Sequence, residues 1–373
     1  MRIAQIAPIA ERVPPKKYGG TERVIYALTE ELVKKGHNVT LFASGDSITS
    51  ARLISVVPKS LRESGLKDLY GYNTQSMMNM GLAYAMQDQF DVIHDHNPHI
   101  DLPTANLSLT PTVMTWHGPY DKQIERYFSL LGNNVHLVSI SKSQGAHTDL
   151  SFEGTVYNGL YMEDYPFSDK PQDYLLYVGR IDEEKGTHIA IDVAVKANKK
   201  LIIAAKLDDM VPHIREYFKR EVEPRLKKHA NLINWIGEVD EKERNELMKN
   251  SLCLLHPITW PEPFGLTLIE SMACGAPVIA FAMGSIPEVI KHGKTGFVVK
   301  DVDGMLDALK NIDKIDRASC RRYALGRFSA QNMASGYEKV YKQVIEKRKI
   351  VESIWPKKTK NIFGTLVFRP SSS

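Results

Sequence analysis

The sequence predicts an α/β protein of two domains, each built on a parallel β-sheet, and three observations lead to this prediction. The chain has 373 residues, more than one hydrophobic core usually supports, so two domains are expected. Short apolar runs recur without polar alternation, which is typical of strands covered on both faces. Amphipathic stretches separate many of these runs, and this alternation is the order of a parallel sheet.

Nine apolar runs are the expected strands: residues 3–7, 39–43, 92–93, 113–116, 137–140, 175–178, 201–205, 252–255 and 278–281. The first expected helix covers residues 21–35, where Val24, Leu28 and Leu32 repeat at four-residue spacing and Gly36 follows as a stop. A last helix is expected from about residue 330 to 347, and the tail after it should be poorly ordered.

A polar, proline-containing stretch divides the chain, and strand–helix alternation restarts after it with YLLYVG. We therefore expect an N-terminal domain at residues 1–160, a linker at 161–173 and a C-terminal domain at 174–329. Residues 330–373 should form a C-terminal helix and tail, with the helix packing back toward the N-terminal domain.

Composition is that of an ordinary globular protein, with 43% hydrophobic and 25% charged residues. The net charge of +4 gives no electrostatic case for nucleic acid as the main partner. Three cysteines without a CxxC pair are typical of reduced thiols, and no apolar run approaches the length that spans a bilayer. We expect a cytoplasmic protein, with peripheral contact at the inner membrane face as an alternative.

The most informative stretch is WPEPFGLTLIESMAC at residues 260–274. Two prolines favour extended backbone, and Gly265 opens a helical run, so Glu262 should lie on a loop rim and Glu270 on the helix. The free N–H groups of a helix N-terminus suit a phosphate. One carboxylate can then accept hydrogen bonds from sugar hydroxyls and the other from ribose hydroxyls. A proline-rich loop with two solvated glutamates is the alternative.

This stretch resembles the E-x7-E signature of the retaining GT-B glycosyltransferases of family 4, with MACGAPVIA, PEVI and HGKTGFVV following it. YGGTERVIYAL, DVIHDH, TWHG, SISKSQ, YNG, VGRIDEEKG and FSAQNMASGYEKVY agree in order and spacing, so the resemblance covers nearly the whole chain. It implies two Rossmann-like domains whose parallel sheets face an interdomain cleft. It also implies transfer of a hexose-type sugar, with retention and without a metal or other cofactor. The donor would be a UDP- or GDP-sugar, and the acceptor a sugar, lipid or small molecule.

The motif VGRIDEEKG places Arg180 and Lys185 after the first strand of the second domain. In the family the matching residues bind the donor diphosphate. The chemistry agrees, because fixed cations stabilise the charge on a departing diphosphate. Taken alone, the motif fits two solvated surface charges equally well.

Gly19 and Gly20 lie between the first strand and the first helix, where backbone amides can approach a phosphate. A lone Gly-Gly is more often a turn, but its position and the resemblance favour phosphate binding. The resemblance extends donor binding to a further set around the expected helix start: Glu262, Phe264, Gly265, Leu266, Thr267 and Glu270. Glu262 would hold the sugar and Glu270 the ribose.

His117 follows a buried strand, which places it at the edge where α/β proteins keep their ligands. By resemblance it faces the donor sugar and the reacting phosphate, and the alternative is a hydrogen-bonded loop histidine. The resemblance assigns the chemistry to His117, Arg180, Lys185 and Glu262, with no metal ligand among them.

Other functions stay open at this point. His94, His96 and His99 offer the chemistry of a metal-dependent hydrolase, although DVIHDH matches a strand end at the family's cleft. A GT-B epimerase or phosphorylase is a nearer rival, and E-x7-E with the paired Arg and Lys favours sugar transfer over it. A sugar-binding protein without catalytic activity is the third alternative. The DxD at residues 301–303 resembles a metal motif, but we expect Asp301 to cap a helix.

Two motifs depart from the family pattern. YNGLYMEDY lacks the aspartate that commonly follows NG, which puts the interdomain linker in question. In MGSIPEV a glycine-glycine turn is replaced by Gly284 and Ser285, which puts the backbone near the sugar in question.

Overall fold

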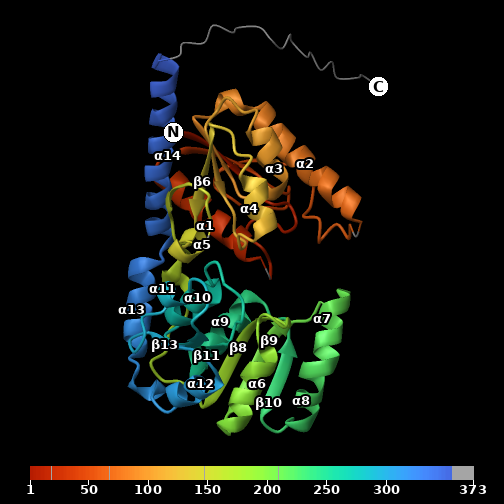
Figure 1. Cartoon of the computed structure of the whole chain (residues 1–373), viewed down its shortest axis with the longest axis vertical. Helices are drawn as coiled ribbons and strands as arrows, with labels where there is room; N and C mark the ends of the chain where they lie inside the picture. The colour runs from red at the N-terminus through yellow and green to blue at the C-terminus, as the bar shows by residue number, and fades with distance from the viewer. Residues whose placement is uncertain (18, 67, 147, 209, 355–373) are drawn as a thin grey trace.

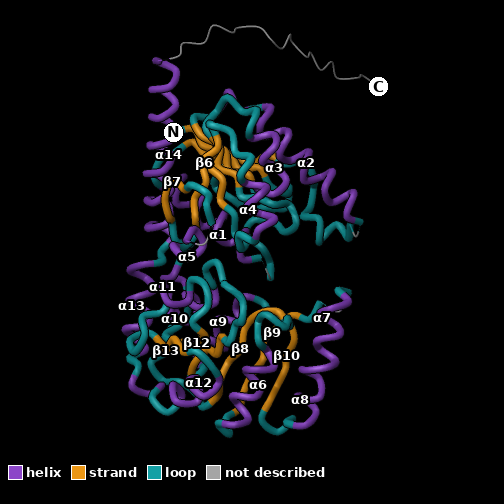
Figure 2. The backbone as a smooth tube through the Cα atoms, viewed as in Figure 1, coloured by secondary structure: helices purple, strands orange, loops and turns teal. Residues whose placement is uncertain are grey.

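The computed structural model describes residues 1–373 except 18, 67, 147, 209 and 355–373. Two α/β domains are stacked along the long axis, the N-terminal one in red to yellow and the C-terminal one in green to blue (Figure 1). Helices surround the strands in both domains (Figure 2). Of the tail that we expected to be poorly ordered, the residues up to 354 belong to a helix, and residues 355–373 lie outside the described residues.

The N-terminal domain contains a seven-stranded parallel sheet in the order β3-β2-β1-β4-β5-β6-β7. Its strands are β1 (Arg2–Ile6), β2 (Asn38–Phe42), β3 (Arg52–Ile54), β4 (Val92–Asp95), β5 (Thr112–Thr115), β6 (Val135–Ser139) and β7 (Phe152–Thr155). Its helices are α1 (Gly20–Lys34), α2 (Leu69–Ala85), α3 (Pro98–Ala105), α4 (Lys122–Phe128) and α5 (Lys142–Ala146). The strand order reverses between β1 and β4, where such sheets open a ligand crevice.

The C-terminal domain repeats this topology in a six-stranded parallel sheet, β10-β9-β8-β11-β12-β13. Its strands are β8 (Tyr174–Arg180), β9 (Lys200–Lys206), β10 (Ile233–Gly237), β11 (Cys253–His256), β12 (Val278–Phe281) and β13 (Gly296–Val299). Its helices are α6 (Thr187–Lys196), α7 (Pro212–Tyr217), α8 (Glu223–Lys228), α9 (Glu241–Asn250), α10 (Leu266–Ala273), α11 (Ile286–Val289), α12 (Val302–Leu309) and α13 (Arg317–Arg327). The two parallel sheets confirm the predicted fold class.

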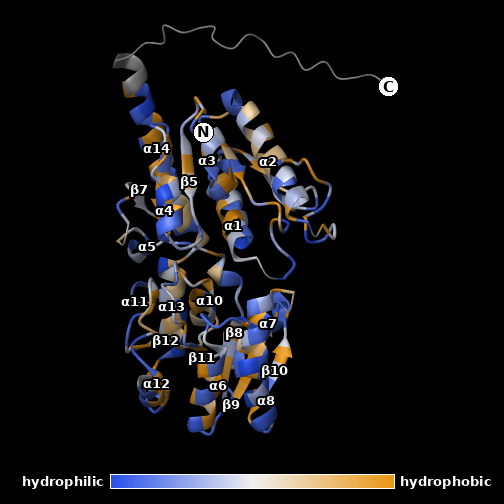
Figure 3. Ribbon diagram, turned by 45° about the vertical axis from the view of Figure 1, so that its right-hand side comes forward, coloured by the Kyte–Doolittle hydropathy of each residue, from blue (hydrophilic) through white to orange (hydrophobic). Residues whose placement is uncertain are grey.

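Helices cover the sheets with their apolar faces, and many of them carry both hydrophilic and hydrophobic residues (Figure 3). On α1 the predicted stripe of Val24, Leu28 and Leu32 is fully buried. Asp301 caps α12 as predicted, because its Oδ1 accepts a hydrogen bond from the Gly304 N–H at 2.8 Å. None of the helices among the described residues combines the length and apolar character that a membrane crossing needs.

The chain connects the domains twice, after β7 and after α13, and the two connections pair with each other. The Leu160 N–H donates to the Phe328 carbonyl at 3.1 Å, and the Ala330 N–H donates to the Leu160 carbonyl at 2.9 Å. After the second connection α14 (Ala330–Ile354) runs along the N-terminal domain and packs against α1 (Figure 1). It extends past the expected end near residue 347.

Candidate active site

A cavity of about 370 Å³ lies between the two domains. The N-terminal domain lines it with the segment after β1 and with residues after β5 and β6, and the C-terminal domain with the ends of β8 and β11 and the start of α10. These are carboxyl ends of parallel strands, where α/β proteins bind ligands. All but one of the predicted site residues line the cavity: Gly19, Gly20, His117, Arg180, Lys185, Glu262, Phe264, Gly265, Leu266 and Thr267.

Two helices begin at this cavity with a glycine cap. Gly19 precedes α1 with φ 151°, and Gly265 precedes α10 with φ 81°. Neither cap makes a side-chain hydrogen bond to its helix, so the first backbone amides stay available for a ligand. The helix starts lie close together, since a Cβ on Gly20 would stand 3.0 Å from Leu266 Cδ1. Their positive dipole ends favour an anion between the domains.

Two cations flank the start of α10. Lys185 Nζ lies 2.8 Å from Glu262 Oε2 and 4.7 Å from the ring centroid of Trp260. The Lys185 side chain is only 20% exposed, whereas that of Arg180 is 43% exposed and lies 3.9 Å from Asp182. Lys185 is therefore held in place by its contacts, while Arg180 has room to turn toward an anion in the cavity.

The loop between β8, which ends at Arg180, and α6 carries Lys185 and packs tightly on the loop after β11. Gly186 follows Lys185 with φ 71°, and a Cβ there would stand 2.1 Å from the Pro257 carbonyl oxygen. Only glycine fits this approach without moving the backbone.

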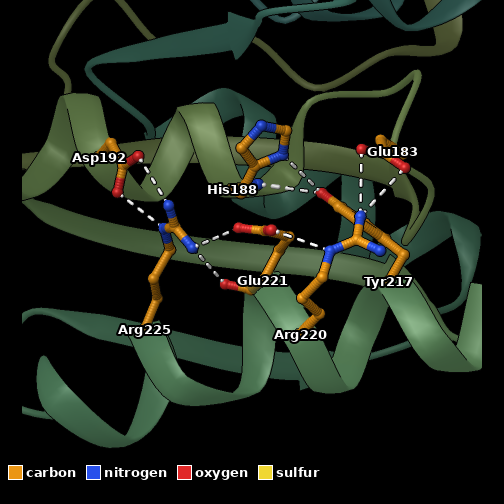
Figure 4. Close-up of polar contacts among 7 residues, drawn as sticks. All are labelled: Glu183, His188, Asp192, Tyr217, Arg220, Glu221 and Arg225. Carbon is orange, nitrogen blue, oxygen red and sulfur yellow. Dashed lines mark hydrogen bonds and ion pairs between the residues drawn. The ribbon is translucent and has the colours of Figure 1, made fainter.

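On its outer side the same loop joins a polar cluster between α6 and the helical segment 212–228 (Figure 4). Arg220 pairs with Glu183 at 3.2 Å, and Arg225 pairs with Asp192 at 2.9 Å. Such exposed pairs are worth about 0–1 kcal/mol each, so the packing of Gly186 is the stronger constraint on the loop.

The backbone of Glu262 is fixed by the turn that departs from the family pattern. The Ser285 N–H donates to the Glu262 carbonyl at 2.9 Å. Gly284 keeps a left-handed φ of 55°, and a Cβ there would stand 2.4 Å from the same carbonyl oxygen. Ser285 has φ −76°, so the turn retains glycine at the position that requires it and accepts serine at the next.

His117 projects into the cavity as a neutral imidazole, because burial lowers its pKa to about 4. Its Nε2 lies 3.0 Å from His96 Nδ1. Both ring nitrogens of His94 and of His96 have hydrogen-bond partners in the protein, and His99 lies against Trp116. The three histidines of the hydrolase alternative are therefore not assembled as ligands, and the described residues hold no group of three or more His, Cys, Asp or Glu placed to bind a metal.

Several cavity residues were not predicted. Asn158 Oδ1 and His256 Nε2 are buried without a hydrogen-bond partner among the described residues, and burial lowers the pKa of His256 to about 3. His256 ends β11, so the strand-end argument used for His117 also applies to it. Asn158 belongs to the YNG motif that carried the resemblance.

The N-terminal wall contributes two further carboxyls, Glu11 and Glu22. Glu11 forms an ion pair with Arg62. Burial raises the pKa of Glu22 to about 7. Neither residue was predicted, although Glu22 lies in the YGGTERVIYAL motif that carried the resemblance.

Glu270 is the predicted site residue that the structure places outside the cavity. It is fully buried and accepts a hydrogen bond from the Tyr165 hydroxyl at 2.9 Å. It also pairs with Arg244 at 3.1 Å and with Arg23. Arg23 belongs to α1 and lines the cavity, so this ion pair joins the domains. The ribose-binding role of Glu270 stays a prediction, and it requires a rearrangement at Arg23.

Two facing Rossmann-like domains, with a cavity between the carboxyl ends of their parallel strands, define a protein of the GT-B class. Residues 18–146 match the family model described as Glycosyltransferase Family 4, and residues 163–324 match that of Glycosyl transferases group 1. The chain therefore belongs to family 4 of the glycosyltransferases, as the resemblance predicted, and it is a transferase. The hydrolase and the binding protein without catalysis are thereby set aside.

Curated relatives and solved structures cover most of the chain. It is 24% identical over 318 residues to a phosphatidyl-myo-inositol mannosyltransferase of Propionibacterium freudenreichii subsp. shermanii, which covers 78% of this chain and 79% of that protein. It is 24% identical over 398 residues to a glycogen synthase of Mycobacterium tuberculosis, and the match covers 90% of this chain and 94% of that protein. A sucrose-phosphate synthase structure from Thermosynechococcus elongatus has a TM-score of 0.75 at 18% identity, with 93% and 99% covered. Anabaena HepE in complex with UDP and glucose has a TM-score of 0.69 at 17% identity, with 92% and 100% covered.

Proposed function

We propose that the enzyme transfers a hexose-type sugar from a UDP- or GDP-sugar to an acceptor hydroxyl, with retention of configuration and without a metal ion. The observation that carries this proposal is the meeting of Arg180, Lys185 and two glycine-capped helix starts at one interdomain cavity. A leaving nucleotide diphosphate gains negative charge, and fixed cations and backbone amides stabilise it. The complex of HepE with UDP and glucose supports this donor class.

The charged groups and the two helix starts at the cavity each have a part in this reaction. Arg180, Lys185 and the amides at Gly20 and Leu266 bind the diphosphate. Glu262 accepts hydrogen bonds from the sugar hydroxyls, and Lys185 orients it through their 2.8 Å ion pair. The bond between the anomeric carbon and the diphosphate oxygen breaks, and the acceptor oxygen bonds to that carbon from the same face. The acceptor proton passes to the leaving diphosphate, which has become a stronger base.

The acceptor is a sugar, a lipid or another small molecule with a free hydroxyl. We place the enzyme in the cytoplasm, and a lipid acceptor would bring it to the inner face of a membrane. The N-terminal wall, with Glu11, Glu22 and Arg62, is the side of the cavity left for the acceptor.

Turnover is expected to survive excess EDTA, because protein cations and helix dipoles supply the positive charge that a divalent ion supplies in metal-dependent transferases. The test incubates the enzyme with UDP-glucose, UDP-galactose and GDP-mannose and measures the nucleoside diphosphate released, with and without the chelator. Equal rates support the proposal. A rate that EDTA abolishes and Mg²⁺ or Mn²⁺ restores would contradict the metal-independent step.

A further inference from the structure

A buried chain of hydrogen bonds leads from α14 to His117. Tyr341 lies on α14, Gln5 on β1, and His96 directly after β4. Gln5 and Tyr341 are fully buried, and His96 is 3% exposed. The chain runs from His117 Nε2 to His96 Nδ1 at 3.0 Å and from His96 Nε2 to Gln5 Oε1 at 2.9 Å. From Gln5 Nε2 it continues to the Tyr341 hydroxyl at 3.1 Å.

Beyond Tyr341 the chain continues to two more buried groups. The Tyr341 hydroxyl lies 2.6 Å from His94 Nδ1, and His94 Nε2 lies 2.9 Å from Thr115 Oγ1. Burial holds the pKa of His94, of His96 and of His117 below the ordinary value. Each imidazole is therefore neutral, with one nitrogen that donates and one that accepts. Fixing one proton in such a chain fixes all the others.

The orientation of the Gln5 side-chain amide fixes the direction. Its Nε2 faces the Tyr341 hydroxyl and can only donate, so the Tyr341 oxygen accepts from it. The Tyr341 proton is then left to donate to His94 Nδ1. The Gln5 carbonyl then faces His96 and can only accept, so His96 carries its proton on Nε2. His96 Nδ1 must accept from His117, which leaves the proton of His117 on Nε2.

We propose that Tyr341, acting through Gln5 and His96, is a positioning residue that holds His117 in the tautomer with an unprotonated Nδ1. Nε2 of His117 is occupied by His96, and Nδ1 is the nitrogen left for a ligand in the cavity. A lone pair there accepts a hydrogen bond from a hydroxyl and cannot donate one to a phosphate oxygen. His117 thus binds a sugar hydroxyl, and the diphosphate is left to the cations and helix starts. This role in transfer rests on the proposed function, whereas the tautomer does not.

Nitrogen NMR of the full chain labelled with ¹⁵N-histidine reads the tautomer directly, and His117→Gln assigns the signals by their loss. In the wild type, His117 is expected to show a protonated Nε2 and an unprotonated Nδ1 at neutral pH. A protonated Nδ1 would overturn the proposal. It would mean that the Gln5 amide is turned over, which reverses every donor and acceptor along these hydrogen bonds. The tautomer is read on the wild type, and the variant serves only to assign the His117 signals.

Variants test whether Tyr341 and Gln5 set the tautomer of His117. Tyr341→Phe removes the acceptor of the Gln5 amide, so His117 should become a mixture of tautomers. Gln5→Glu keeps an acceptor toward His96 and should retain the wild-type tautomer. Tyr337→Phe is the matched control, since Tyr337 is equally buried one turn away and contacts Thr115 at the end of the chain. An unchanged spectrum in folded Tyr341→Phe, or a changed tautomer in Gln5→Glu, would remove Tyr341 from its assigned role.

Kinetic measurements test whether the tautomer of His117 matters for binding the donor sugar. Tyr341→Phe is expected to lower kcat/KM for the donor sugar by about 2- to 10-fold, the worth of one neutral hydrogen bond. Its affinity for the free nucleoside diphosphate should match the wild type, because that ligand lacks the sugar hydroxyl. A shifted tautomer with unchanged kcat/KM would leave the positioning intact and refute the role of His117 in sugar binding.

Discussion

Lys185→Ala is expected to lower kcat/KM by about 10- to 100-fold, because a hydrogen bond to a charged group is worth about 1.5–3 kcal/mol. The ammonium is fixed by Glu262 and Trp260 before any ligand arrives. A preorganised cation needs no reorientation as charge develops on the leaving group, so its effect is concentrated in the transition state. Arg180→Ala should act in the same direction.

The control for this prediction is Lys199→Ala. Lys199 pairs with Asp173 at the amino ends of β8 and β9, the ends that lie away from the cavity. Its removal should leave kcat/KM unchanged. Steady-state kinetics on folded variants decide the matter. Wild-type kinetics in Lys185→Ala would place the donor diphosphate elsewhere.

Glu270→Gln is expected to lower the free energy of unfolding by about 3–5 kcal/mol, the cost of breaking a buried ion pair by removing one partner. Glu270 is fully buried, and the substitution leaves the buried guanidinium of Arg23 without its counter-charge and Arg244 with only the exposed Glu241. Because Arg23 lies in the other domain, the loss should also weaken the contact between the domains. Chemical denaturation of wild type and variant at neutral pH measures the difference.

The same carboxylate gives this stability a pH dependence. Burial alone would raise the pKa of Glu270, but Arg23 and Arg244 outweigh burial and hold it below the ordinary value. A lowered pKa stabilises the fold fully above the ordinary value, near 4.3 for glutamate, and the contribution is lost as the pH falls toward the lowered value. The difference between wild type and Glu270→Gln should therefore shrink in acid.

Glu223→Gln is the matched control, since Glu223 forms an exposed pair with Lys227 on α8. It should change the free energy of unfolding by less than about 0.5 kcal/mol. If Glu270→Gln is as stable as this control, the buried cluster does not hold the domains together.

Sequence reasoning identified the interior strands and missed the edges. Each of the nine predicted runs falls on an interior strand of one of the sheets, and β3, β7, β10 and β13 are the edge strands that it missed. An edge strand pairs with only one neighbouring strand and is less fully covered by helices. Its sequence therefore does not need a continuous run of apolar residues. The segment Phe152–Thr155 has no buried residue, and Ile233–Gly237 carries the exposed Asn234 and an irregular register.

The site was predictable where its residues form local motifs. E-x7-E placed Glu262 on a loop and Glu270 on a helix. VGRIDEEKG placed both cations on the loop after the first strand of the second domain, and the structure has Lys185 on that loop but Arg180 as the last residue of β8. The partner of Glu270 in the other domain could not be predicted, because Arg23 is 247 residues away in the chain. The same reason hides the connection between Tyr341 and His117. Contacts across the fold depend on packing that no local spacing reveals.

Calorimetric titration of UDP and of GDP into the wild type and into Lys185→Ala tests the central claim most directly. That claim is that the cavity between the domains binds the diphosphate of a nucleotide-sugar donor through protein cations. We expect one of the two nucleotides to bind the wild type at one site per chain and to bind Lys185→Ala about tenfold or more weakly. Binding of neither nucleotide, or equal affinity for both proteins, would contradict the account.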